Sequence, residues 1–200
     1  MNVVALVSCV LYLVLLWWIT SKSMQRYKAG TADIFSACVS GSGDSLRSAI
    51  RELTHSAAVG LNINMFDIDG NTPLILAAAN GHVEICQRLL REGARVDVPV
   101  FGDSRPMRNC LLLYVRRRWT ALHIAAHRGH AGVVRVLLQA IRAAAGRVES
   151  GAMRLADPDA YKDAVKDTPL HVAARAGHDE VVSLLASTFP TWADERNSRG

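Results

Sequence analysis

Three histidines in the middle of the chain have the spacing of a metal site. His123, His127 and His130 lie at i, i+4 and i+7, so a helix over this stretch would place them near one face. Histidines at helical spacing are common zinc ligands. His123 and His130, however, occupy fixed places in a pattern that recurs elsewhere in the chain, which leaves only His127 to be assigned. A single histidine does not make a metal site, so we expect no bound metal.

The stretch Ser40-Gly-Ser-Gly-Asp-Ser45 resembles a phosphate-binding loop. It lacks the glycine spacing and the lysine of such a loop, and a flexible connection between two helices is the better interpretation. The sequence also contains no Gly-x-Ser-x-Gly nucleophile elbow, no His-Glu-x-x-His zinc motif and no kinase signature. We therefore expect no enzyme, no cofactor and no small-molecule substrate.

The elements that position these residues occur three times in the chain. Thr72 to His82, Thr120 to His130 and Thr168 to His178 share a threonine, a run of small and apolar residues, a glycine and a final histidine. The threonine hydroxyl can cap the start of a helix, and the glycine nine residues later can end it in a left-handed conformation. A second helix follows, with apolar residues paired one turn apart. Neither helix can bury its apolar stripe alone, so the copies must stack.

The motif and its two-helix layout resemble the ankyrin repeat, which has a period of about 33 residues. The resemblance implies an all-α fold, an ankyrin-repeat solenoid of stacked helix-turn-helix units. In that family the motif histidine, here His123 and His171, holds the turn by hydrogen bonds. The copies depart from the motif at Ile75, which replaces that histidine, and at Ala121, which replaces proline. The third copy carries Ala186 where the other copies have a second leucine.

The capping threonines are spaced more widely than the family period, so each gap must hold an insertion. We expect one domain at 33–200, with repeats at 33–61, 62–98, 116–142 and 164–197, insertions at 99–115 and 143–163, and a polar linker at 21–32. In the degenerate first repeat the two helices would be joined through Gly41 and Gly43. Residues 197–200 align with the turn that precedes Thr72, so the chain stops inside the turn that would open another repeat.

The N-terminal segment predicts a membrane anchor. Residues 2–20 carry no charge and are long enough to cross a bilayer as one helix. Trp17 and Trp18 stand where an interfacial aromatic belt would lie. A cleaved signal peptide is the alternative, with Ser21 and Ser23 near the cleavage site, but the apolar run is longer than usual and no basic segment precedes it. We expect a single transmembrane helix at 2–20 ahead of the repeats.

Charged residues predict the orientation of this anchor. Lys22, Arg26 and Lys28 follow the apolar run, whereas only the α-amine precedes it. The positive-inside rule therefore places the repeats in the cytosol, and the protein would be a single-pass membrane protein. The four cysteines show no close pairing, and reduced thiols suit that compartment.

The net charge of the chain indicates which kinds of partner are favoured. The formal charge is +5 at pH 7 and the sequence pI is about 9.3, which favours acidic partners or anionic lipid, although a modest excess is often only a solvated surface. No nucleic-acid partner is expected. The family resemblance places the partner-binding face at the turn tips and the exposed positions of the first helices, which here are Arg116, Arg117, Arg118, Trp119, His127, Arg128 and Arg175.

This set of residues indicates the chemistry of the ligand. Arginine and tryptophan dominate interface hot spots, and the arginines favour a carboxylate-rich or phosphorylated protein. Two alternatives stay open: residues 116–118 form an ordinary solvated turn, or they lie with residues 111–115 on an anionic membrane surface.

Two functions follow from the sequence. The chain is expected to be a membrane-tethered ankyrin scaffold or adaptor, without catalysis, that binds a protein through its basic concave face. The alternative is the N-terminal regulatory region of a larger membrane enzyme or channel that continues beyond residue 200. Because ankyrin repeats serve proteins of many functions, the fold does not choose between these two possibilities.

Overall fold

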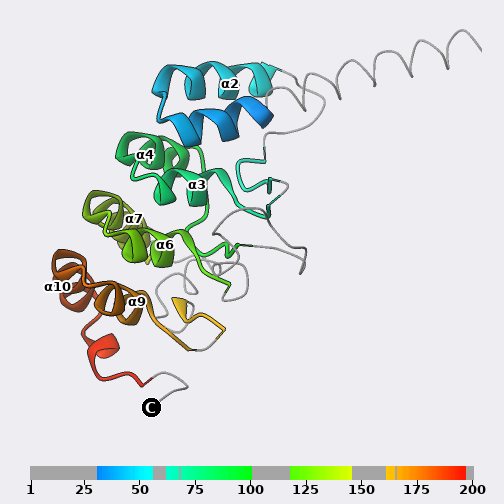
Figure 1. Cartoon of the computed structure of the whole chain (residues 1–200). Coiled ribbons are helices and arrows are strands. Elements are labelled where there is room, and N and C mark those ends of the chain that lie inside the picture. Colours follow the sequence, from blue (N-terminus) through cyan, green and yellow to red (C-terminus); the bar gives the residue numbers. More distant parts are fainter. Residues whose placement is uncertain are drawn as a thin grey trace, which may run out of the picture.

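The computed structural model describes residues 31–55, 62–67, 69–100, 118–145, 161–164 and 166–196. These residues form stacked helix pairs and contain no strand, which confirms the predicted all-α repeat architecture (Figure 1). The predicted transmembrane helix at 2–20 and most of the linker lie outside the described residues. Within the described ranges, no helix is both long enough and apolar enough to cross a membrane.

Within the described ranges, the helices form four consecutive pairs. The first pair is a helix at 31–40 followed by α2 (Gly43–His55). The next pairs are α3 (Pro73–Ala79) with α4 (Val83–Arg91), α6 (Ala121–Arg128) with α7 (Ala131–Ala145), and α9 (Pro169–Ala176) with α10 (Asp179–Thr188); the short 3-10 helix η2 (Pro190–Ala193) follows.

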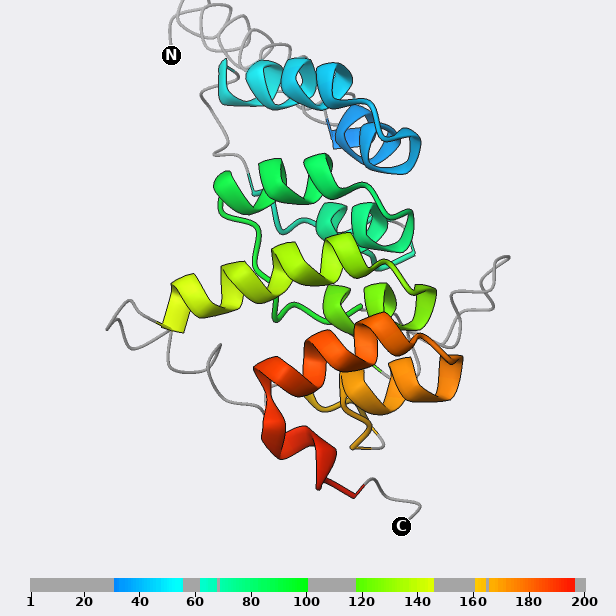
Figure 2. The ribbon, with the colours of Figure 1, turned by 90° about the vertical axis from the view of Figure 1, so that its left-hand side faces the viewer.

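The pairs stack so that equivalent helices lie next to one another. First helices pack in one row, with α6 between α3 and α9, and second helices pack in another, with α7 between α4 and α10. Figure 2 shows this second row as successive ribbons along the stack. We call the row of α3, α6 and α9 the inner row, and the row of α4, α7 and α10 the outer row.

Local sequence explains where the first helices begin and end. The hydroxyl oxygens of Thr72 and Thr168 accept hydrogen bonds from the N–H groups of Ile75 and His171, and Thr120 forms a capping box with His123. The predicted terminal glycines Gly81, Gly129 and Gly177 have φ angles of 76°, 74° and 77°. The predicted left-handed helix ends are therefore confirmed. In the first pair, α2 already begins at Gly43, so the connection is shorter than the sequence suggested.

A histidine joins each repeat to the previous one. His82 Nε2 donates to the carbonyl oxygen of Val39 at 3.0 Å, and His130 Nε2 donates to that of Ala79 at 3.2 Å. His178 Nε2 donates in the same way to the carbonyl oxygen of His127, at 3.0 Å. Each acceptor lies two residues before the terminal glycine of the preceding repeat, so the same bond recurs along the whole stack.

The ring of each of these histidines lies against a glycine. A Cβ atom added at Gly41 would lie 2.6 Å from Cε1 of His82, and one at Gly129 would lie 2.6 Å from Nδ1 of His178. The corresponding position at Gly177 has no described atom within 4 Å. Glycine is thus favoured at Gly41 and Gly129 for two reasons. The backbone φ is left-handed, and the histidine ring of the next repeat leaves no room for a side chain.

An aromatic cluster completes the last repeat. Tyr161, Phe189 and Trp192 pack on one another, and η2, which contains Trp192, lies beside α10; the Phe189 and Trp192 ring centroids are 4.2 Å apart. Tyr161 and Trp192 are almost fully buried. The end of the stack is therefore closed by residues that lie outside the repeated motif.

His123 is the most deeply buried of the three histidines with metal-like spacing. Thr120 N–H donates to its Nδ1 at 3.3 Å, and its Nε2 donates to the carbonyl oxygen of Asp167 at 3.3 Å, in the following repeat. These two bonds match a neutral ring with the proton on Nε2. Burial is the main cause that lowers the His123 pKa to about 4, against the opposing effect of hydrogen bonding to the Asp167 carbonyl and of nearby carboxylates.

Gly129→Ala and Gly177→Ala form a matched pair that tests the joint between repeats. Both variants place alanine at a left-handed φ, which costs about 1 kcal/mol. Only Gly129→Ala also displaces the His178 ring, so we expect it to lose about 1 kcal/mol more in the free energy of unfolding. Urea unfolding of the two variants measures the difference. Equal losses would show that the histidine ring does not constrain the stack.

Acid should weaken the fold through His123. Its folded pKa lies below the ordinary value of 6.5, so the unfolded chain binds more protons as the pH falls from 6.5 towards 4. Between pH 7 and pH 5 this group should lower the free energy of unfolding by about 2 kcal/mol. Urea titrations at both pH values give the measurement, and His123→Gln should lose most of the difference while being less stable at pH 7. An unchanged pH dependence in that variant would contradict the assignment.

Candidate functional site

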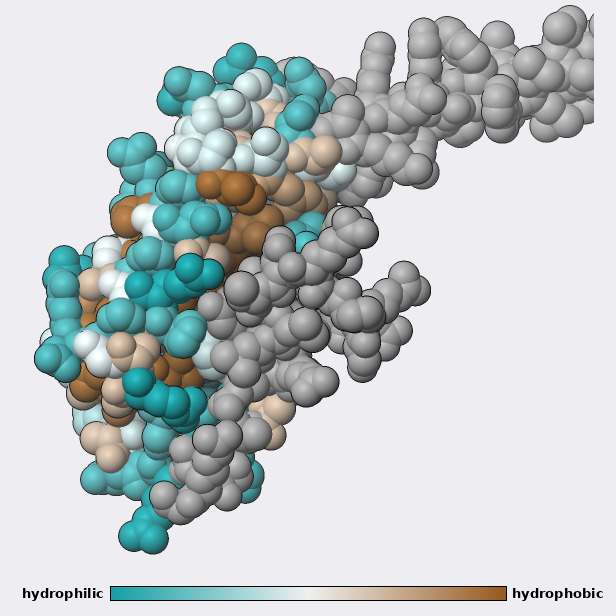
Figure 3. All heavy atoms as spheres, viewed as in Figure 1, coloured by the Kyte–Doolittle hydropathy of each residue, from teal (hydrophilic) through white to brown (hydrophobic). Residues whose placement is uncertain are grey.

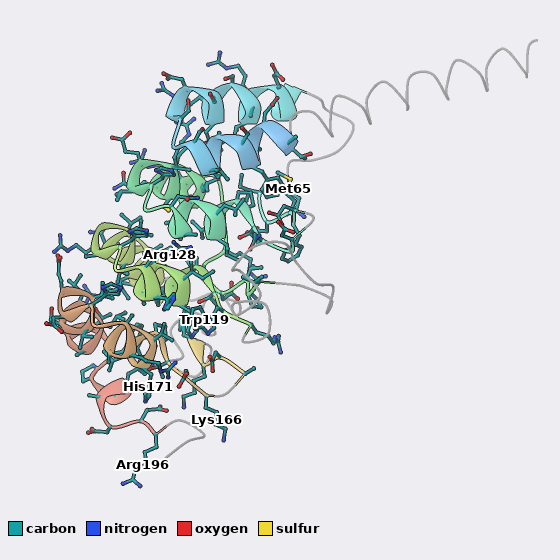
Figure 4. The ribbon with its side chains drawn as sticks, in the orientation of Figure 1. Met65, Trp119, Arg128, Lys166, His171 and Arg196 are labelled. Carbon is teal, nitrogen blue, oxygen red and sulfur yellow. The ribbon has the colours of Figure 1, made fainter. Side chains whose placement is uncertain are left out.

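The candidate site lies where the inner row meets the turns between repeats. Of the seven predicted residues, Arg116 and Arg117 lie outside the described residues, and the other five come from α6, α9 and the turn before α6. Figure 4 shows Arg128 at the level of α6 and Trp119 nearby. In Figure 3 apolar surface gathers over α3, whereas hydrophilic surface dominates over α6. We call Arg118, His127, Arg128 and Arg175 the basic face.

The prediction that Trp119 is an exposed anchor for a partner is wrong. Its side chain is 1% exposed, and Nε1 donates to Asp163 Oδ2 at 2.9 Å. The ring stacks on His123, with centroids 6.1 Å apart, and the Trp119 carbonyl accepts a hydrogen bond from Val100 N–H. Trp119 belongs to the core because the chain at the end of the second insertion returns to the turn of the third repeat, where Asp163 bonds to the Trp119 ring.

His127 lies at the centre of the basic face and is partly buried. Its ring packs edge to face on Trp119, with centroids 5.3 Å apart, and its carbonyl accepts the inter-repeat bond from His178. Burial lowers the His127 pKa, and the charges of Arg128, His178 and Arg175 lower it further. The same electrostatics show that cationic groups from two repeats converge around this ring.

The two helical arginines of the basic face differ in their surroundings. Arg128 ends α6 with an exposed side chain. Arg175 Nη2 donates to Asp167 Oδ2 at 2.8 Å, and the Arg175 side chain is 45% exposed while that of Asp167 is 1% exposed. Removing Arg175 would leave a buried carboxylate without this ion pair, which is strongly destabilising. Arg175 therefore has a structural role in addition to any contact with a partner.

Two aspartates of the site were missed at the level of sequence. Asp163 and Asp167 are both buried, and Asp163 Oδ1 accepts a hydrogen bond from Asp167 N–H at 2.8 Å. Asp163 stands as far before Thr168 as Asp67 stands before Thr72, and Asp67 Oδ1 accepts the equivalent bond from Asn71 N–H. Aligning the turns as well as the helices would have found the turn role of Asp163. No pattern in the sequence predicts the hydrogen bond between Asp163 and Trp119.

The three histidines with metal-like spacing have separate partners in the structure. His123 bonds to its own turn and the next repeat, His130 bonds back to Ala79, and His127 packs on Trp119. Among the residues that the structure describes, no group of three His, Cys, Asp or Glu side chains could hold a metal ion. Arginines at a partly buried surface suit carboxylate and phosphate groups.

Comparison with known proteins agrees with this architecture. A family model described as ankyrin repeats in three copies matches residues 8–100, 34–143 and 104–191. The chain is 33% identical over 184 residues to the human transient receptor potential cation channel subfamily A member 1, and 34% identical over 123 residues to its Caenorhabditis elegans homolog. The matches cover 70% and 62% of this chain but only 16% and 8% of those channels.

A much shorter relative is matched over most of its length. The human Notch-regulated ankyrin repeat-containing protein is 33% identical over 119 residues, which are 58% of this chain and 89% of that protein. The family match, the repeated helix pairs and the capped turns all agree. This chain belongs to the ankyrin-repeat family.

Proposed function

We propose that this ankyrin-repeat domain binds an acidic or phosphorylated segment of a partner protein through its basic face and performs no catalysis itself. Ankyrin repeats are protein-interaction modules, so a protein partner is the general expectation for the fold. The proposal adds the chemistry of the partner and the surface that contacts it.

The observation that carries the proposal is the convergence of cations around His127. Arg128 comes from α6 and Arg175 from α9 in the next repeat, so arginines of two repeats lie near the His127 ring. Arg118 and Arg128 have exposed side chains at this surface, which makes them candidates for contact with a ligand. A guanidinium group forms short charge-assisted hydrogen bonds with carboxylate and phosphate.

A second candidate function follows from the relatives. Two of the similar proteins are named as cation channels, and this chain spans only a small part of each. We therefore keep the proposal that the domain is a regulatory region of a larger membrane protein. In both candidates residues 2–20 tether the domain to a membrane with the repeats in the cytosol, a proposal that rests on the uncharged apolar sequence.

Arg128→Ala tests the basic face. The full chain, kept soluble with a neutral detergent, is titrated into a labelled peptide of glutamate and serine, and fluorescence anisotropy gives the dissociation constant. We expect the variant to weaken binding about fivefold and to reduce its salt dependence, because an exposed charge pair contributes up to about 1 kcal/mol.

The matched control is Arg91→Ala, which removes the same charge from the exposed end of α4 in the outer row. It should leave the affinity almost unchanged. A glutamine and serine peptide of the same length measures binding that does not depend on charge. Equal weakening by both variants would mean that only the net charge matters, and absence of binding by the unaltered chain would refute the acidic-partner proposal.

Carbonate extraction of cells that express the full chain tests the membrane tether. The protein should stay in the membrane fraction, and its repeats should be cleaved by protease added to the cytosolic side. A variant that lacks residues 2–20 should appear in the supernatant. Recovery of soluble protein that begins near Gln25 would instead indicate a cleaved signal peptide.

A further inference from the structure

Two long basic side chains occupy equivalent turn positions in neighbouring repeats. Arg118 lies two residues before the capping Thr120, and Lys166 lies two residues before the capping Thr168. The same position in the first of the three copies, before Thr72, is Gly70. The three residues therefore have the same place in the turn that opens each repeat.

The backbone at this position is left-handed in all three copies. The φ angles are 75° at Gly70, 56° at Arg118 and 59° at Lys166, and the last two are the non-glycine residues with positive φ within the described ranges. Glycine adopts this conformation without steric cost, whereas a residue with a Cβ atom does so rarely. Two repeats thus carry a strained basic residue where glycine would fit better. Such outliers concentrate at functional sites.

The surrounding structure holds both residues in place. The residues that follow them, Trp119 and Asp167, are 1% exposed, and Lys166 N–H donates to the carbonyl oxygen of Asp163 at 3.0 Å. The side chains themselves are exposed, and neither makes a hydrogen bond or ion pair with any residue that the structure describes. Figure 4 shows Lys166 at the edge of the stack that the turns form.

We propose that Arg118 and Lys166 form a cation pair that binds two carboxylates of an extended acidic protein segment lying along the turn edge. This inference rests on the function proposed above and names the contacts that select the partner. Stacked helices lie about 8–10 Å apart, so equivalent turns are separated by about that distance. An extended segment in the polyproline II conformation rises about 3.1 Å per residue and has three residues per turn, so glutamates three residues apart lie on one side, about 9 Å apart, and match the pair.

An acidic protein segment suits this edge better than a membrane surface. Among the described residues, the two cations at equivalent positions stand on backbone that the buried side chains of Trp119 and Asp167 hold in place. Adsorption to anionic lipid instead requires clusters of several basic residues, each contributing by charge alone. A fixed pair at a defined spacing is a feature that a particular sequence can match.

The test uses variants that relieve strain while they remove charge. In the full chain in neutral detergent, Arg118→Gly combined with Lys166→Gly should keep or raise the midpoint of thermal unfolding, because glycine fits the left-handed turn. The same double variant should bind a labelled peptide with glutamate at every third position about tenfold more weakly than the unaltered chain. Loss of binding therefore could not be attributed to unfolding.

A charge-conserving exchange is the control. Arg118→Lys combined with Lys166→Arg keeps both cations and the strain, and its affinity for the peptide should stay within about twofold of the unaltered chain. Vesicles of phosphatidylcholine and phosphatidylserine replace the peptide in a parallel titration. Preferential, glycine-sensitive binding to the vesicles would overturn the peptide assignment in favour of a membrane contact.

The outcomes separate this inference from the proposed function. If the double glycine variant binds the peptide as well as the unaltered chain while Arg128→Ala weakens binding, the cation pair is refuted and the basic face stands. If the unaltered chain does not bind the peptide, both are refuted. A lower unfolding midpoint in the glycine variant would refute the strain on which the inference depends.

Discussion

Contact between consecutive repeats is the constraint on which the structure depends, because a single pair of short helices cannot bury its own apolar faces. The recurring bond from His82, His130 and His178 to the preceding repeat sets how each pair is placed on the last. It also adds a second reason for glycine at Gly41 and Gly129, where a side chain would collide with the histidine ring of the next repeat. The contacts between consecutive repeats therefore determine both the stability of the stack and the shape of its surface.

Contact between repeats also decides which polar groups are buried and which are exposed. Trp119, Asp163 and Asp167 meet where the third and fourth repeats join, and their hydrogen bonds are internal. Arg175 is drawn into the same network through Asp167. At the boundary of the network, Arg128 ends α6 with an exposed side chain, and the turn residues Arg118 and Lys166 are also exposed. A buried polar network thus supports an exposed basic surface and gives it a fixed form.

The long insertions fit the same scheme. The residues that follow the second insertion return to the stack, where Tyr161 enters the aromatic cluster and Asp163 reaches Trp119. An insertion is tolerated when its ends are close and well anchored, since the cost of closing a loop grows slowly with its length. Anchoring of this kind keeps the inner row continuous across the inserted residues, and α6 packs on α9 despite them.

The sequence by itself determined the repeats, the capping threonines, the left-handed glycines and the apolar pairs of the second helices, because these depend on residues close together in the chain. It also indicated the basic character of the inner face. Only the tertiary structure decided that Trp119 is buried, that Arg175 is paired with Asp167 and that Arg118 and Lys166 both adopt a left-handed φ. The Trp119 bond joins residues on either side of an insertion, whose path no local propensity specifies. A turn residue is buried only when segments distant in sequence pack over it, and the packing of those segments is decided in the assembled stack.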